Sequence, residues 1–153
     1  MHTPHRRMFL QNRIMELQQA LFYDESQSVL KFPTSIINVL HADDVDQIWF
    51  MVNRPLQHLN EFEKEFRARL DFFKKGKDYY LHVVGKACVV GDPEEINNVE
   101  VLDNESRKLA SSSMALIRMK ITKTYYYPII SGIAIFSEIV YHVILSPAIV
   151  IVF

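Results

Sequence analysis

The segment from residue 35 to residue 58 constrains the fold of this chain more than any other. Two apolar runs rich in β-branched and aromatic residues, at 36–40 and 48–52, flank the polar segment HADDVDQ, which a core could not easily bury. This pattern predicts a β-hairpin. Hydrogen-bonding side chains follow the second run, at Asn53, Arg54, Gln57 and His58. They lie where the strand is expected to end and a helix to begin, and such an exit suits an anion.

Length and composition predict an ordinary globular protein. A chain of 153 residues is most often one domain and is long enough to bury a sizeable core. Hydrophobic residues make up 49% and charged residues 23%, and the formal net charge of −1 gives no general attraction to nucleic acid. We therefore expect a single domain over residues 1–153, with any polyanion-binding surface confined to one place.

The cysteine content and the N-terminus bear on the compartment. The only cysteine, Cys88, lies in an apolar run, which excludes an intrachain disulfide and predicts a buried, inert thiol. The N-terminal sequence alternates charged and apolar groups and lacks the unbroken apolar core of a secretory signal. Both features predict a reducing, cytoplasmic location.

Helical periodicity occurs twice. Between residues 6 and 22 the apolar residues recur at spacings of three and four, which predicts an amphipathic N-terminal helix within residues 1–24. After His58, one face of a second predicted helix carries Leu59, Phe62, Phe66 and Leu70. The charged residues between them are expected to form its solvated face.

The second half of the chain predicts two more strand regions and a short helix. The β-rich run at 79–90 contains Gly85, which indicates a bulge or a close backbone approach. Asp92 is a candidate helix N-cap, and the helix should reach toward Glu105. The polar string SRKLASSS is expected to be a connection to an alternating strand that begins near residue 114.

The apolar C-terminal segment, residues 128–153, is long enough to span a bilayer. Glu138 and His142 fall near its middle, a glycine and a proline interrupt it, and no Lys or Arg follows Lys123. These features favour a helix packed on the domain or at a dimer interface. A membrane segment and a disordered C-terminus are the alternatives.

Several sites of known chemistry are not expected. One cysteine and six scattered histidines form no zinc pattern, and the four glycines form neither a P-loop nor a dinucleotide fingerprint. No nucleophile elbow occurs, and no residue stands out as a general acid or base. The basic and aromatic string KKGKDYYLH could bind nucleic acid, but a solvated turn that leads into a buried strand is favoured.

Four strings resemble, in their order and spacing, one known family. They are VLKFPTSIINVL, QIWFMVNRPLQHL, ARLDFF and YYLHVVGKACVVGDPEEI. Together they span about two thirds of the chain and resemble the pyridoxamine 5′-phosphate oxidase-like FMN-binding split barrel, nearest to its short general stress protein branch. The resemblance implies a mainly β (α+β) split β-barrel with flanking helices. It also implies a homodimer in which two strands and the turn after the second hold one FMN, with each site completed across the dimer interface.

The resemblance implies the following cofactor-binding residues: Ser35, Ile36, Ile37, Met51, Val52, Asn53, Arg54, Gln57, His58, Lys75 and Tyr80. By position, Met51, Val52 and Asn53 would lie against the flavin ring or the ribityl chain. Tyr80 falls where the family often has a glutamine from the neighbouring strand.

The phosphate end departs from the family pattern. Family members carry a Ser-Arg-Lys-like phosphate clamp at the positions of Leu56, Gln57 and His58 here. Arg54 and His58, with a contribution from Lys75, would have to supply the charge-assisted hydrogen bonds to a phosphate. The phosphate clamp predicted for this chain therefore has fewer phosphate-binding side chains than is usual in the family.

The resulting functional hypothesis is an FMN-binding protein with oxidoreductase capacity and an unknown substrate. Vitamin B6 oxidation is not expected, because the oxidase recognises its substrate with an arginine-containing C-terminal motif and no arginine follows Arg118 here. F420 or haem in place of FMN stays open. One alternative is a cofactor-free split-barrel dimer that acts as an interaction or stress-response module. The other is a membrane-tethered protein anchored by the C-terminal segment.

Overall fold

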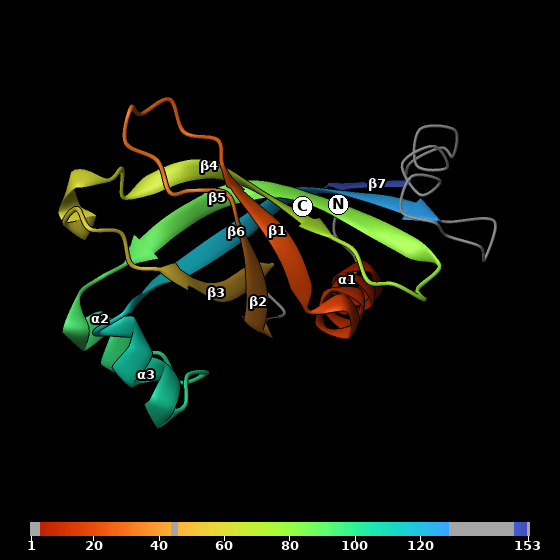
Figure 1. The fold of residues 1–153 in the computed structure, drawn as a ribbon. Helices are drawn as coiled ribbons and strands as arrows, with labels where there is room; N and C mark the ends of the chain where they lie inside the picture. Colours follow the sequence, from red (N-terminus) through yellow and green to blue (C-terminus); the bar gives the residue numbers. More distant parts are fainter. Residues whose placement is uncertain (1–3, 44–45, 129–148, 153) are drawn as a thin grey trace.

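The computed structural model describes the backbone at residues 4–43, 46–128 and 149–152. Strands dominate it, α1 lies at one end, and α2 and α3 lie at the other (Figure 1). In chain order the elements are α1 (Pro4–Leu17), β1 (Gln19–Asp24), β2 (Ser35–Ala42), β3 (Gln47–Asn53), the 3-10 helix η1 (Leu59–Glu61), β4 (Glu65–Phe72), β5 (Tyr79–Val90), α2 (Pro93–Asn97), α3 (Asn104–Ala110), β6 (Met114–Pro128) and β7 (Ile149–Val152).

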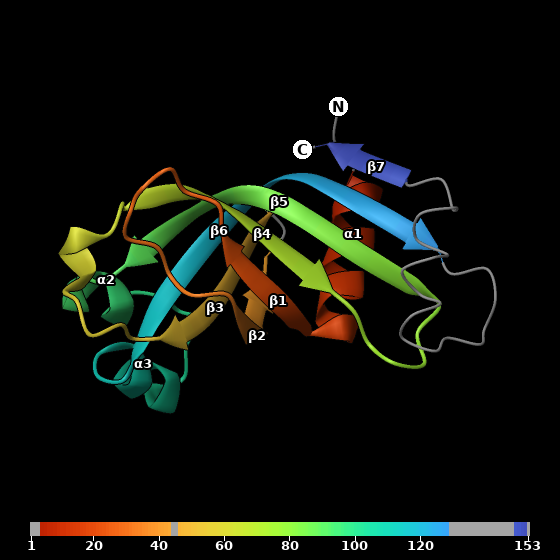
Figure 2. The ribbon, with the colours of Figure 1, turned by 45° about the horizontal axis from the view of Figure 1, so that its top comes forward.

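The strands form one antiparallel sheet in the order β3-β2-β1-β4-β5-β6-β7. An additional antiparallel pairing of β3 with β6, from Gln47↔Lys120 to Asn53↔Met114, closes the first six strands into a barrel (Figure 2). β7 extends the sheet beyond β6. A closed six-stranded antiparallel barrel with a few helices is the split-barrel fold that the sequence predicts.

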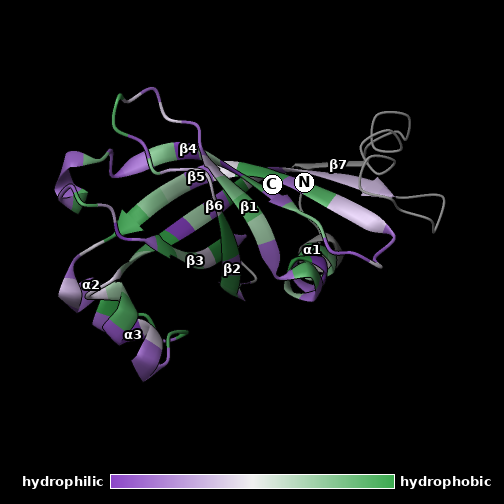
Figure 3. Ribbon diagram, in the orientation of Figure 1, coloured by the Kyte–Doolittle hydropathy of each residue, from purple (hydrophilic) through white to green (hydrophobic). Residues whose placement is uncertain are grey.

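Two apolar clusters hold this architecture together. The larger one fills the barrel, and strands alternate between apolar and polar residues along their length (Figure 3). Its fully buried members include Phe22, Phe50, Leu70, Leu81 and Ile117. The smaller one joins α2 and α3 to the outside of the barrel, and its members are Trp49, Val90, Ile96, Leu102, Ala110 and Leu116. Cys88 is a buried free thiol, as predicted.

The N-terminal helix is shorter than the predicted helix within residues 1–24. It ends at Leu17, and β1 follows after Gln18, which has a φ of 64°. β1 pairs with β2 on one side and with β4 on the other. Ala20 and Phe22 point into the core with the period of a strand. Residues 19–22 also fit the apolar spacing of a helix, but the pairing of β1 with β2 and β4 makes them a strand.

The predicted helix after His58 is wrong. Only η1 is helical there, and residues 65–72 form β4, which pairs with β1 and β5. Phe66, Ala68, Leu70 and Phe72 are buried and alternate with charged residues. Phe62, Phe66 and Leu70 are spaced by four, which suits a helix face and also suits one face of a strand.

Other local predictions are confirmed, with one change after α2. The hairpin forms as β2 and β3, β5 shifts register between Val84 and Gly85, and Asp92 caps α2 by accepting from the N–H of Glu94 at 3.0 Å. However, α2 ends at Asn97, and part of the expected SRKLASSS connection belongs to α3. Asp103 begins α3 by accepting from the N–H of Ser106 at 2.7 Å.

The prediction for the C-terminal segment falls mostly on residues 129–148, which lie outside the described residues. Residues 149–152 are a strand rather than part of a helix, with Val152 opposite Lys123 of β6. Within the described part of the chain, no helix has the length and apolar character needed to cross a membrane.

Candidate functional site

The predicted site residues form two groups far apart on one chain. One group lies at the end of β3 and just after it, at residues 51–58. The other comprises Lys75 and Tyr80 together with Ser35, Ile36 and Ile37, which pair with Phe22, Leu21 and Ala20 of β1 and through β1 lie beside residues 70–72 of β4. Asn53 pairs with Met114 of β6, whereas Tyr80 pairs with Tyr127, thirteen positions later. This separation corresponds to roughly 40 Å of extended strand. A single copy therefore does not bring the two groups together.

At the start of β2 and the end of β3, the side chains face different environments. Ile36 points outward and is 71% exposed, whereas Ile37 and Val52 are buried in the barrel core. Ser35 is half-buried. Met51 is also half-buried, packs against the smaller apolar cluster, and leads to the exposed Asn53. The side chains of Ile37 and Val52 therefore belong to the core, and Ile36 and Asn53 face outward.

Arg54 binds the protein's own backbone. Its N–H donates to Ser113 O at 2.9 Å, its Nε to Met114 O at 3.2 Å, and its Nη2 to Ala110 O at 2.7 Å. Ala110 is the last residue of α3, where carbonyl groups lack partners within the helix and favour a cation. Arg54 thus ties the end of β3 to the junction of α3 with β6.

The residues that follow Arg54 carry a carboxylate at the position where the sequence predicts a bound anion. Oε2 of Glu61 accepts from the N–H of His58 at 3.0 Å, and the N–H of Glu61 donates to His58 O at 3.0 Å. The side chains of Gln57 and His58 are exposed. Because the helix start is already satisfied by a protein carboxylate, the residues present here do not fit an FMN phosphate.

At the other end, Tyr80 belongs to a charged and aromatic cluster on the outer face of β1, β4 and β5. Asp71 lies at its centre, with His82 Nδ1 2.7 Å from Oδ1 and Arg69 Nε 3.4 Å from Oδ2. The Arg69 guanidinium covers the ring of Tyr23 at 3.9 Å. Burial, and then Asp71, raise the pKa of Tyr80 well above its usual range, which keeps its hydroxyl protonated as a hydrogen-bond donor.

Lys75 lies in the turn between β4 and β5, where it lines a pocket together with Gln18, Gln19, Asn38 and Lys74. Tyr80 continues from this turn into β5, and its ring centroid lies 5.9 Å from that of Tyr127. The turn, Tyr80 and Tyr127 therefore form the second half of the candidate site.

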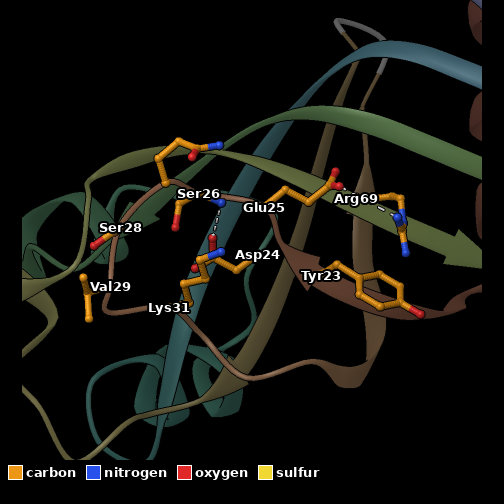
Figure 4. Close-up of a pocket in the computed structure, with 9 residues that line it drawn as sticks. Tyr23, Asp24, Glu25, Ser26, Ser28, Val29, Lys31 and Arg69 are labelled. Atoms are coloured by element: carbon orange, nitrogen blue, oxygen red, sulfur yellow. Dashed lines mark hydrogen bonds and ion pairs between the residues drawn. The ribbon is translucent and has the colours of Figure 1, made fainter.

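Two hollows beside the Asp71 cluster were not anticipated from the sequence. The first, with a volume of ≈ 480 Å³, lies between Arg69 and the loop after β1 (Figure 4). Asp24 shapes this loop by accepting from the N–H groups of Ser26 and Phe32, each at 2.9 Å. Glu25 lies 3.8 Å from both Arg67 and Arg69. Asp24, Glu25 and Arg69, three of the charged residues that line this hollow, are therefore already engaged within the protein.

The second hollow is a groove of ≈ 830 Å³ that crosses β4, β5 and β6 at the Gly85 bulge. Its volume is in the usual range of ligand pockets. Charged residues of both signs line it, among them Glu25, Arg67, Lys86 and Lys123. The alternation of charged and apolar residues after position 63 could have predicted the strand that lines this groove. It was overlooked because the segment was interpreted as a helix. Among the described residues, no group of three His, Cys, Asp or Glu side chains could hold a metal ion.

Comparisons with known proteins identify the fold. No family model and no curated protein matches the sequence. A Clostridium acetobutylicum protein related to general stress protein 26 of B. subtilis, of the pyridoxinephosphate oxidase family, matches with a TM-score of 0.62 at 12% identity, over 90% of this chain and 99% of that one. The general stress FMN/FAD binding protein of Xanthomonas citri matches with a TM-score of 0.60 at 12% identity, over 87% and 95%.

General stress protein 26 from Bacillus anthracis str. Sterne also matches, with a TM-score of 0.51 at 14% identity, over 80% of this chain and 93% of that chain. At such identities the similarity establishes the fold alone. The chain therefore has the split-barrel fold of general stress protein 26 and of pyridoxamine phosphate oxidase-related proteins.

Proposed function

We propose that this chain binds a flavin at a site formed by two copies together, and that it acts as a flavin-dependent oxidoreductase on a substrate still to be identified. The observation that carries the proposal is the separation of the two groups of site residues along β6. In a two-fold dimer each contact occurs twice, so the Asn53 end of one copy can face the Tyr80 end of the other. The fold shared with an FMN/FAD binding protein supports the choice of ligand.

Each copy would contribute a different part of such a site. From the first copy, Asn53 offers an amide at the exposed end of β3. From the second copy, the outward-facing Ile36 offers an apolar surface that favours burial. Tyr80 of the same copy offers an aromatic ring near Asp71. A bound flavin supplies the redox chemistry, and the chain binds and orients it.

Complementation between two variants tests this arrangement. Asn53→Ala removes the amide from one half of each site and Tyr80→Ala removes the aromatic ring from the other, so neither variant alone should bind riboflavin or FMN as the wild type does. Mixed dimers of the two variants would contain one intact and one doubly damaged site. We expect half of the wild-type binding stoichiometry in these mixed dimers, measured by quenching of flavin fluorescence.

Val101→Asp is the control, because Val101 is exposed and lies outside both groups. It should bind flavin as the wild type does. Mixed dimers without binding would contradict the shared site. Wild-type protein that binds neither flavin at high micromolar concentration would contradict flavin binding altogether.

One observation favours a second candidate function. Arg54 and the N–H of His58, both expected at the phosphate, are engaged by the protein itself. A split-barrel dimer that has lost its cofactor and acts as an interaction module would show this arrangement. A wild-type protein that forms dimers but binds no flavin would support this candidate.

A further inference from the structure

We infer that the flavin site of this chain does not recognise the phosphate, and that it binds a flavin with an uncharged tail, such as riboflavin, as tightly as FMN. This inference rests on the proposed function and narrows its ligand. It depends on the exit of β3, at residues 53–61, where the sequence predicts the phosphate end.

The first argument concerns Arg54, the only arginine of this exit. Its Nε and Nη2 donate to the carbonyls of Met114 and Ala110, and its backbone N–H donates to Ser113. Turning the guanidinium toward a phosphate would leave two carbonyl groups at the end of α3 and the start of β6 without these donors. The loss of those bonds would offset the gain from a charge-assisted bond to the ligand.

The second argument concerns the backbone donors that a phosphate would use at a helix start. Pro55 has no N–H, and the N–H of His58 is already bonded to Glu61. Leu56 presents a fully exposed apolar side chain at the position of the family's clamp serine. The exit therefore offers a phosphate neither the serine hydroxyl nor the N–H of these two residues.

The third argument concerns charge. Glu61 places its carboxylate on the His58 N–H, where it would repel a phosphate dianion. Gln57 is neutral, and the exposed His58 is the remaining cationic candidate at the former clamp positions. Within residues 53–61 the attraction for a phosphate comes from one exposed histidine and is opposed by one carboxylate, so this segment gives FMN little advantage over riboflavin.

Parallel titrations of riboflavin and FMN into wild-type protein in phosphate-free buffer test the inference. We expect dissociation constants within about threefold of each other, whereas a charge-assisted phosphate contact would favour FMN by about tenfold or more. Glu61→Gln should tighten FMN binding and leave riboflavin binding unchanged. Glu63→Gln, an exposed glutamate two positions later, is the matched control and should change neither.

Arg54→Ala separates the two roles of the arginine. If Arg54 only positions the end of β3, Arg54→Ala should weaken the binding of riboflavin and the binding of FMN equally. It should also alter the emission of Trp49, the only tryptophan, which packs in the cluster beneath α3. Selective loss of FMN binding would mean that Arg54 binds the phosphate.

Wild-type protein that binds FMN at least tenfold more tightly than riboflavin would overturn the inference and leave the proposed function standing. Binding of neither flavin would overturn both. A third readout needs no flavin: millimolar inorganic phosphate should not shift the amide NMR signals of residues 56–61 relative to chloride at equal ionic strength. A saturable phosphate-dependent shift would contradict the inference.

Discussion

At the scale of single residues, Tyr79 shows how the end of the barrel beneath α1 is built. Its side chain is 1% exposed, and its hydroxyl donates to Arg13 O at 3.4 Å. Glu16 lies beside it and is paired with Lys77 at 2.7 Å and with Arg13 at 3.1 Å. Burial, and then Glu16, raise the pKa of Tyr79 to about 12. The folded protein therefore favours the neutral phenol.

This raised pKa predicts a loss of stability in alkali. An unfolded tyrosine ionises near pH 10, so between about pH 10 and 12 the unfolded state releases a proton that the folded state retains. The contribution of Tyr79 is therefore fully present below pH 10 and falls as the pH rises toward 12. Urea unfolding at pH 9 to 11.5 should show a free energy of unfolding that declines less steeply in Tyr79→Phe than in the wild type.

If the free energy of unfolding of Tyr79→Phe declines as steeply as that of the wild type, Tyr79 does not contribute to the loss of stability in alkali. Absorbance at 295 nm gives an independent measurement, because the substitution should remove a phenol that ionises well above pH 10. Lysine deprotonation affects both proteins equally and cancels in the comparison.

At the scale of elements, β5 shows why one glycine occupies the middle of a strand. β5 pairs with β4 on one side and with β6 on the other, and the register against β6 shifts between Val84 and Gly85. A Cβ added at Gly85 would overlap the backbone carbonyl of Lys120. Because a backbone atom in a paired strand cannot move aside cheaply, only glycine fits at this bulge.

Gly85→Ala should therefore lower the free energy of unfolding by about 3 kcal/mol. The measurement is urea unfolding followed by Trp49 emission. Gly91→Ala is the control, because a Cβ there would meet only Leu59 Cδ1, at an ordinary 3.7 Å. Equal stability of the two variants would show that β6 yields to the added methyl group.

At the scale of the whole molecule, closure of the barrel places the two groups of site residues at opposite ends. The pairing of β3 with β6 fixes Asn53 opposite Met114, and the pairing of β5 with β6 fixes Tyr80 opposite Tyr127. A second copy is therefore needed if both groups are to contact one ligand. The outward-facing Ile36 lies two strands from Asp71, because Leu21 of β1 pairs with both residues.

Light scattering on purified protein should accordingly give twice the chain mass of 17.9 kDa. Tyr80→Asp should shift the protein toward the monomer, because a new carboxylate beside Asp71 would be buried without a partner at the contact. Val101→Asp should stay dimeric. A wild-type monomer at high micromolar concentration would contradict the shared site.

Local signals in the sequence were sufficient to predict part of the fold. The β2–β3 hairpin, β5 with its bulge, β6 and the Asp92 cap were predictable because alternation, turn residues and capping residues act over a few positions. The contact of Glu61 with His58, three positions apart, was also within reach of such reasoning. It was missed because a longer helix was expected there.

Local patterns could not predict β1, β4 or the hydrogen bonds of Arg54. The apolar spacing of residues 19–22 and 62–70 suits both a helix and a strand, and pairing on both sides selected the strand. Arg54 bonds to Met114 and Ala110, which are 60 and 56 positions away in the sequence. No local pattern reports such contacts, because barrel closure creates them, and they tie the end of β3 to α3 and β6.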